Sequence, residues 1–262
     1  TGGLSSLTRP ADDVYRATYR RLRARNDAYY RRYPADEADW AEVAARLHER
    51  DVRFPDGSRF TVDRLQFLGM ELGRSDGFES LHWLLETAFV VVGGRRQLSQ
   101  RFVHEAFRRQ GFHGNPLFAV LQEAIYAQES ATRWAAQRMR ESAPELAYRP
   151  GGAFRFTGEM IYPWMFEQFP TLRPFREAAE ELARKDDWPR LYDVGALAAN
   201  TVPVAALAYV DDMFVDYALS RETAERVSGL RLWSTDAYQH NGLRADGARI
   251  VDRLLAMSRG PL

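Results

Sequence analysis

The chain has 262 residues, of which 45% are hydrophobic and 13% aromatic, so it can bury a sizeable core and should not be disordered. Its 36 basic residues balance 36 acidic ones, which argues against a nucleic-acid-binding protein, and the absence of cysteine excludes disulfides and thiol catalysis. No apolar run approaches the roughly 20 residues that span a bilayer, and no charged segment precedes an apolar one as in a signal peptide. We therefore expect a cytoplasmic protein that binds neither nucleic acid nor membrane.

From residue 12 to residue 184 the hydrophobic pattern predicts helices almost without interruption. Asn115 is expected to cap a helix that has Pro116 in its first turn, and Thr171 precedes another helical run. The pair Gly93-Gly94 is expected to be a turn between helices. The apolar residues that recur at helical spacing are Trp40, Val43, Ala44 and Leu47, then Leu81, Leu84, Leu85, Ala88 and Val92, then Phe102, Val103, Ala106 and Phe107.

The pattern changes after residue 187. The apolar run Val204–Val210 predicts a strand buried on both faces, and Leu230–Ser234 predicts the next strand. A short helix capped by Ser220 is expected between them, and residues 250–255 predict a last amphipathic helix. Strand, helix, strand, helix in this order indicates a parallel α/β unit. Because two parallel strands do not make a stable sheet, we expect the other strands to lie outside these residues.

Chemically useful side chains follow both predicted strands. Asp211 and Asp212 come directly after the first strand, and His240 follows the second. An acid and then a histidine, in this chain order, is how α/β-hydrolases supply two members of a Ser-Asp-His triad. Taken singly, these residues would more often be ordinary loop residues. The pattern G-x-S-x-G occurs at Gly73-Arg-Ser-Asp-Gly77, but no strand is predicted before it, as a nucleophile elbow would require, and no H-G-G-G oxyanion loop occurs in the sequence.

Several segments resemble the carboxyl-terminal part of prolyl aminopeptidases (proline iminopeptidases), which are serine peptidases of the α/β-hydrolase fold. The resemblance implies a helical cap followed by the last strands and helices of the core, with the nucleophile-bearing amino-terminal half absent. It divides the chain into residues 1–11 leading into the cap, 12–170 as the cap, and 171–262 as the core. The segments that carry it are Ser75-Asp-Gly-Phe-Glu-Ser-Leu-His-Trp-Leu-Leu-Glu86, Phe156-Thr-Gly-Glu-Met-Ile-Tyr-Pro-Trp-Met-Phe166, Val202-Pro-Val-Ala-Ala, Tyr209-Val-Asp-Asp-Met-Phe-Val-Asp216 and Tyr238-Gln-His-Asn-Gly-Leu-Arg244.

The resemblance also implies roles for individual residues. His240 matches the general base of the family. The acid is Asp212, with Asp211 as the alternative, because family members often carry a proline four residues after the acid and Asp216 stands at that distance from Asp212.

A cap glutamate of the family, followed by an aromatic residue, pairs with the free α-amine of the substrate. Glu159 and Tyr162 match these positions. The family uses a second glutamate that the sequence does not place, with Glu79 and Glu123 as candidates. The implied reaction is release of amino-terminal proline from peptides, without a cofactor or a metal ion, and the implied partners are such a peptide and the amino-terminal half of the enzyme.

Other interpretations stay open from sequence. His82 and Glu86, four residues apart, could be metal ligands, although a helical surface or core pair is the commoner arrangement. Aromatic residues between 29 and 33 could stack on bases, but packing is more usual. The residues that could line a proline pocket or simply form the cap core are Trp164, Phe166 and Phe169.

Two other functions compete with a prolyl aminopeptidase. One is an α/β-hydrolase of another substrate class, such as an esterase or an epoxide hydrolase, because the fold does not fix the function. The other is a non-enzymatic helical ligand-binding protein, against which the two strands near the carboxyl terminus argue. Glu159 distinguishes a prolyl aminopeptidase from a hydrolase of another substrate class, because an amine-binding carboxylate has no purpose in an enzyme for neutral esters.

Overall fold

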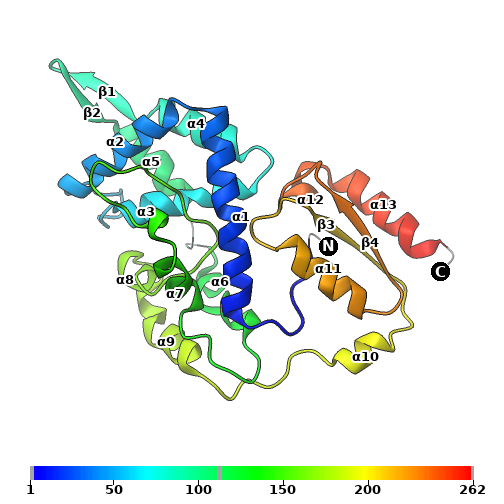
Figure 1. Cartoon of the computed structure of the whole chain (residues 1–262). Coiled ribbons are helices and arrows are strands. Elements are labelled where there is room, and N and C mark those ends of the chain that lie inside the picture. Colours follow the sequence, from blue (N-terminus) through cyan, green and yellow to red (C-terminus); the bar gives the residue numbers. More distant parts are fainter. Residues whose placement is uncertain (1–2, 111, 113, 261–262) are drawn as a thin grey trace.

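The computed structural model describes residues 3–110, 112 and 114–260. Figure 1 shows a larger helical part and a smaller part with a parallel strand pair, and the long helix α1 lies on the side of the helical part that faces the smaller part. Each part has its own apolar cluster. The larger cluster takes residues from Ala11 to Phe214, and the smaller one is formed by Leu207, Tyr209, Trp233 and Ile250.

The helical part is built from the long helix α1, which packs mainly on α7 and η1, and from shorter helices that pack on one another. Aromatic side chains dominate its core, and Tyr29 and Trp40 are completely buried. The α-helices are α1 (Ala11–Arg32), α2 (Asp36–Glu49), α3 (Val62–Phe67), α4 (Gly77–Glu86), α5 (Gln100–Arg109), α6 (Pro116–Leu121), α7 (Ala135–Glu141), α8 (Met165–Gln168) and α9 (Arg176–Arg184), and the 3₁₀ helices are η1 (Leu68–Gly73), η2 (Ala124–Tyr126), η3 (Pro144–Leu146) and η4 (Arg173–Phe175).

A β-hairpin interrupts the helical part, where the sequence predicted a continuing helix. Strand β1 (Phe89–Val92) pairs antiparallel with β2 (Arg95–Leu98), and the hairpin projects from the molecule in Figure 1. Gly93 and Gly94 both have positive φ, at 55° and 75°, as a two-residue hairpin turn requires. The expectation that Ala88 and Val92 continue the face of α4 was therefore wrong, because α4 ends at Glu86.

Two predicted helix starts have different outcomes. Asn115 caps α6 as expected, with its side chain accepting the Phe118 N–H and Pro116 in the first turn. The helix expected directly after Thr171 begins only at Arg176, because the 3₁₀ turn η4, with a proline in its first turn, comes first.

The smaller part is the parallel α/β unit that the sequence predicted. Strand β3 (Val204–Tyr209) pairs in parallel with β4 (Leu230–Thr235), with Leu207 opposite Trp233. The helix between the strands contacts both of them, and the last helix packs on β3. The helices of this part are α10 (Val194–Ala198), α11 (Tyr217–Arg226), α12 (Gly242–Ala245) and α13 (Gly247–Arg259).

Helix α11 begins earlier than predicted. Its cap is Asp216, whose carboxylate accepts the N–H groups of Ala218 and Leu219. Ser220, the predicted cap, lies inside the helix, and its hydroxyl instead donates to the carbonyl oxygen of Leu4 at 3.0 Å. The expectation was wrong because the serine has a partner from the beginning of the chain, which the local pattern does not reveal.

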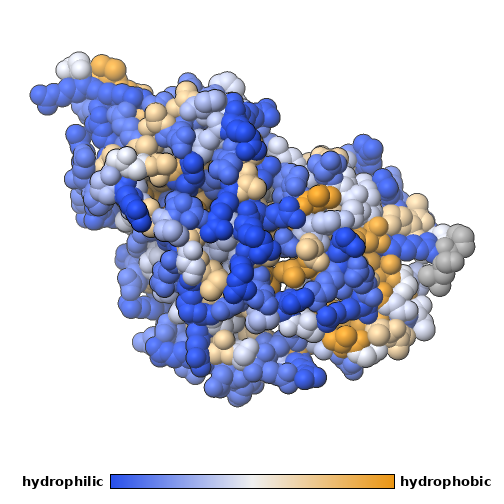
Figure 2. All heavy atoms as spheres, viewed as in Figure 1, coloured by the Kyte–Doolittle hydropathy of each residue, from blue (hydrophilic) through white to orange (hydrophobic). Residues whose placement is uncertain are grey.

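The beginning of the described chain lies beside β3. The N–H of Gly3 donates to the Leu207 carbonyl at 2.9 Å, on the edge of β3 that β4 does not occupy. Apolar side chains remain exposed on this smaller part, and Figure 2 shows them gathered over its surface. The large exposed ones between residues 191 and 255 are Leu191, Val202, Leu243, Val251 and Leu255.

Candidate active site

The carboxylate of Asp212 is the most constrained group at the end of β3. It is 1% exposed, and its Oδ1 accepts the backbone N–H groups of Phe214 at 2.8 Å and Val215 at 3.1 Å. Its Oδ2 lies 2.9 Å from Nδ1 of His240. Both carboxylate oxygens are thus occupied, so the side chain has a fixed direction. Asp211 is 57% exposed and lies 3.8 Å from Arg21 on α1, away from this arrangement.

His240 follows β4 and reaches Asp212 because parallel strands end at the same edge of a sheet. Its backbone N–H donates to the carbonyl of Gly73 in the helical part at 3.1 Å. The ring of Phe214 packs edge-to-face on the imidazole, with centroids 5.0 Å apart. With Nδ1 directed at the carboxylate, the imidazole presents Nε2 as a proton acceptor.

The charge balance around the imidazole favours protonation. Burial alone would lower the pKa of His240, but the hydrogen bond and charge of Asp212, together with the charge of Glu159, outweigh it and raise that pKa. The two carboxylates therefore stabilise the imidazolium, which is the form that a general base becomes when it accepts a proton.

Glu159 lies on an irregular segment of the helical part that approaches the loop after β3. The two segments are in close contact at Gly158, where a Cβ would stand 2.7 Å from the terminal methyl group of Met213. Burial raises the pKa of Glu159 to about 7; the charge of His240 opposes this rise and that of Asp212 adds to it. Glu159 is thus a poorly solvated carboxyl in the electrostatic field of the Asp212–His240 pair.

Tyr162, the predicted aromatic partner of Glu159, is completely buried within the helical part. Its hydroxyl forms a 2.8 Å hydrogen bond with the hydroxyl of Tyr19, and the guanidinium of Arg140 lies over its ring. These contacts make Tyr162 a packing residue of the helical part, and its contact with substrate stays a prediction.

The two candidates for a second amine-binding glutamate have other partners. Glu79 forms an ion pair with Arg32 on the surface. Glu123 is 6% exposed, and its carboxylate accepts the N–H groups of Ala135 at 2.9 Å and Ala136 at 3.1 Å, so it caps α7. The structure therefore gives each of them a structural contact and does not bring either into a hydrogen bond with Glu159 among the described residues.

Sequence reasoning missed two tyrosines near Glu159. Tyr15 on α1 and Tyr126 on η2 pack edge-to-face with ring centroids 5.8 Å apart. Burial raises the pKa of both, and the charge of Glu159 raises it further. The Tyr15 hydroxyl is buried without a hydrogen-bond partner in the described part of the chain. The helical periodicity of α1 would have placed Tyr15 on a buried face, but nothing local connects it with Glu159.

The residues for which the sequence left a metal-binding or base-stacking role open make contacts within the fold. His82 contacts both oxygens of Asp36 at 3.0–3.1 Å and stacks on Tyr33, while Glu86 is exposed, so the pair is not arranged as metal ligands. Within residues 3–110, 112 and 114–260 no group of three or more metal-ligating side chains occurs. Those residues also contain no helix long and apolar enough to cross a membrane. Of the aromatic residues that the sequence left open to a binding role, Tyr29, Tyr30, Phe166 and Phe169 are at most 7% exposed in the core of the helical part, and Trp164 is partly buried against that core.

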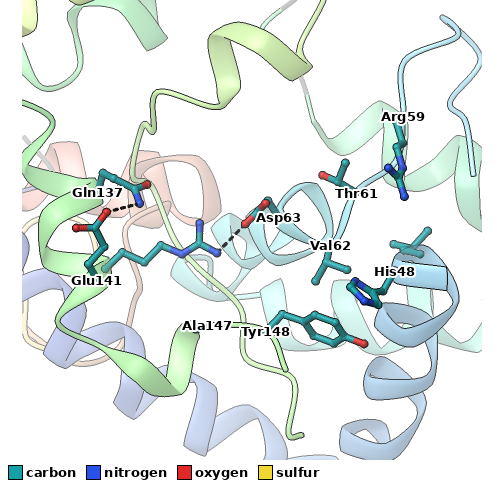
Figure 3. Close-up of a pocket in the computed structure, with 11 residues that line it drawn as sticks. His48, Arg59, Thr61, Val62, Asp63, Gln137, Glu141, Ala147 and Tyr148 are labelled. Atoms are coloured by element: carbon teal, nitrogen blue, oxygen red, sulfur yellow. Dashed lines mark hydrogen bonds and ion pairs between the residues drawn. The ribbon is translucent and has the colours of Figure 1, made fainter. Parts of the chain in front are cut away.

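A separate cavity of about 480 Å³ lies between α2, α3 and α7 (Figure 3). Its lining mixes charges of both signs with His48 and Tyr148, and most of these charges are already paired. Figure 3 shows the ion pair to Asp63, which Arg140 forms at 2.8 Å, and the hydrogen bond between Gln137 and Glu141. None of the residues that line it belongs to the Asp212–His240 arrangement.

Comparison with known proteins relates the chain to one family. No protein-family model matches it. It is 48% identical over 259 residues to a proline iminopeptidase of Aeromonas sobria, a match that covers 99% of this chain and 60% of the relative. The chain is thus similar to a proline iminopeptidase over nearly its whole length. A second relative, the proline iminopeptidase aneH of Aspergillus aculeatus, is 30% identical over 234 residues, 89% of this chain and 52% of that protein.

The chain thus spans between half and two thirds of the length of the iminopeptidases it matches. Its mixture of a helical part and a parallel β-α-β unit agrees with an α/β fold. The matched region includes the strand ends that carry Asp212 and His240 and the segment that carries Glu159, because it covers nearly the whole chain.

Proposed function

We propose that this chain supplies the cap and the acid and base of a serine aminopeptidase that releases amino-terminal proline from peptides. The single observation that carries the proposal is the 2.9 Å hydrogen bond between the buried carboxylate of Asp212 and Nδ1 of His240 at the ends of two parallel strands. The relationship to two proline iminopeptidases supports the reaction class and the substrate.

In the proposed mechanism Nε2 of His240 accepts the proton of a serine hydroxyl as its oxygen attacks the carbonyl carbon of the proline residue. The imidazolium, stabilised by Asp212, then gives this proton to the leaving nitrogen, and the carbon–nitrogen bond breaks. Water, activated by the same imidazole, hydrolyses the acyl-enzyme and releases proline. His240 ends each cycle neutral, with its Nδ1–H still directed at Asp212.

The proposed nucleophile lies in a further part of the same enzyme that packs against the α/β unit. Two observations support this arrangement. The backbone N–H of Gly3 donates to the carbonyl of Leu207 on the outer edge of β3. This edge therefore accepts hydrogen bonds from a further segment, and the sheet can continue on that side. The helix α13 packs on β3, and its apolar side chains Val251 and Leu255 are exposed; such surface favours contact with another layer.

Glu159 is the proposed anchor of the substrate's free amine. Its raised pKa reflects poor solvation, and a cationic amine at this position would restore the charge partner that the carboxylate lacks. The proximity of this carboxyl to His240 is what an aminopeptidase requires, because the amine of proline is two bonds from the carbonyl under attack.

The test uses the intact protein, which here means this chain together with the part of the enzyme that carries the proposed nucleophile. Three substrates are compared: a proline amide, its N-acetylated form and a simple ester. We expect rapid release of proline from the free amide, no release from the acetylated one, and labelling of one serine by a fluorophosphonate. Hydrolysis of the ester with neither amide cleaved would replace the proposal with an esterase, and no labelling or hydrolysis at all would overturn it.

A further inference from the structure

Residues 239–241 form the loop that carries His240, here called the histidine loop. The cap contacts this loop through Gly73–Asp76, here called the histidine clamp. This segment contains the Ser75-Asp-Gly motif, for which the proposed reaction has no role. The hydroxyl of Ser75 accepts a hydrogen bond from the backbone N–H of Gln239 at 3.1 Å, and the backbone N–H of Ser75 donates to Oδ1 of Asn241 at 2.8 Å. The amide of Asn241 also donates to the carboxylate of Asp76 at 3.3 Å. The two residues that flank His240 are therefore both held by the cap.

His240 itself is held by the buried end of the clamp. Its N–H donates to the carbonyl of Gly73 at 3.1 Å, so three successive residues of the loop are fixed by one short segment more than 160 positions away. The connection of Asp76 to Asn241 completes a chain of four hydrogen bonds, and each partner is a backbone group or a short side chain with few rotamers.

Gly73 has a second contact that depends on its lack of a side chain. A Cβ at this position would stand 2.3 Å from the ring of Phe214. That ring packs on the imidazole of His240, and the Phe214 N–H donates to Asp212. Gly73 therefore contacts His240 through its carbonyl oxygen, and its lack of a side chain leaves room for the Phe214 ring that packs on the imidazole.

We propose that the histidine clamp is the positioning element of the catalytic base, which makes the geometry of the Asp–His pair depend on the seating of the cap. Gly73, Ser75 and Asn241 act through His240 and are positioning residues. The inference rests on the proposed function. A loop that is anchored only by its own strand would let the imidazole swing, and a shift of about 1 Å in a catalytic group costs up to 10²-fold in rate.

The test compares four variants of the intact protein: Gly73→Ala, Ser75→Ala, Asn241→Ala and Ser75→Thr. We measure kcat and KM on a proline amide, and the exchange rate of the His240 Nδ1 proton with water by NMR. The bonds of Ser75 and Asn241 are near the surface, so each alanine should lower kcat about fivefold, and Gly73→Ala should lower it by about 10². KM should change less than twofold, the Nδ1 proton should exchange faster, and Ser75→Thr should restore both values.

Ser142→Ala is the matched control, because this exposed hydroxyl only bonds to a carbonyl of its own segment. The proton-exchange measurement requires no turnover, so it separates this inference from the proposed function. An inactive protein in which the alanine variants still loosen the Nδ1 proton would refute the aminopeptidase and keep the clamp. An active protein in which Gly73→Ala and Asn241→Ala match the control in kcat and in proton exchange would refute the clamp alone.

Discussion

Asp212 and His240 are 28 positions apart in the sequence, and a 2.9 Å hydrogen bond joins their side chains. The contact exists because β3 and β4 are parallel neighbours, so that the residues following each strand meet at one edge. The carboxylate is fixed independently by two backbone N–H groups, which leaves the histidine as the partner that must be brought to it. The carboxylate is therefore fixed in place, and the histidine is held from the helical part through the carbonyl of Gly73.

The first prediction concerns the choice between the two neighbouring aspartates. Asp212→Asn should lower kcat on a proline amide by about 10⁴, because an amide at this position favours the wrong imidazole tautomer. Asp211→Asn should change kcat less than twofold, since its side chain is exposed and only pairs loosely with Arg21. Steady-state kinetics of the two purified variants of the intact protein decide this. A larger loss for Asp211→Asn would show that Asp211, and not Asp212, is the acid.

The second prediction concerns the buried carboxylate of Glu123. Glu123→Ala should lower the free energy of unfolding by about 2 kcal/mol, because the N–H groups of Ala135 and Ala136 lose their acceptor inside the protein. Urea unfolding followed by circular dichroism measures the change. Glu141→Ala is the control, because Glu141 is exposed and bonds only to Gln137 in its own helix. Equal losses for the two variants would refute the capping role of Glu123.

Much of the candidate site could be predicted because it depends on strand ends. The apolar run before Asp212 and the strand before His240 indicate parallel neighbours, and their order predicts the contact. The clamp could not be predicted in this way. Whether Gly73 faces Phe214 depends on how the cap packs against the α/β unit, and the periodicity of either segment contains no information on that.

The hairpin at residues 89–98 shows a different kind of error. Three consecutive valines fit a helix face as well as a strand when only the spacing of apolar residues is considered. The information was present in Gly93-Gly94, because two adjacent glycines between apolar and polar runs are typical of a two-residue hairpin turn. The β-branched composition of the run also favours a strand.

The third prediction separates packing from substrate contact at Tyr162. Tyr162→Phe removes the hydroxyl that bonds to Tyr19 and keeps the ring. If the residue packs within the cap, unfolding should become easier by about 1 kcal/mol, and KM for a proline amide should stay within twofold. Tyr19→Phe is the comparison variant, because it breaks the same bond from the other side and, in addition, the 2.9 Å bond to the carbonyl of Ala136. A rise in KM that occurs only in Tyr162→Phe would instead indicate a contact with substrate.

The fourth prediction is a dependence of stability on pH that arises from Glu159. Its pKa is about 7 in the folded protein and 4.5 in an unfolded chain, so between these values the folded protein binds more protons. Stability contributed by this group is therefore lost as pH rises from 4.5 to 7. Glu159→Gln lacks this loss and should gain about 2 kcal/mol relative to the wild type over that range.

Urea unfolding at pH 4.5 and pH 7.5 measures the difference between the two proteins. The raised pKa of His240 also favours the folded protein at low pH, but its contribution is lost only above about 6.5, and Asp212, which raises that pKa more than Glu159 does, is present in both proteins. Glu79→Gln, on an exposed carboxylate, is the control. A pH-independent difference between wild type and Glu159→Gln would show that Glu159 is well solvated.

The last prediction concerns the discrimination between free and blocked amines. In the intact protein, Glu159→Gln should lower kcat/KM for a proline amide by about 10², because the cationic amine loses its charge partner in a poorly solvated site. Hydrolysis of a simple ester should change less than threefold, since it uses Asp212 and His240 but has no amine to anchor. The preference for the free over the N-acetylated amide should fall by the same factor. Equal losses on the ester and the amide would mean that Glu159 acts on the fold or on His240, and would remove it as the amine anchor.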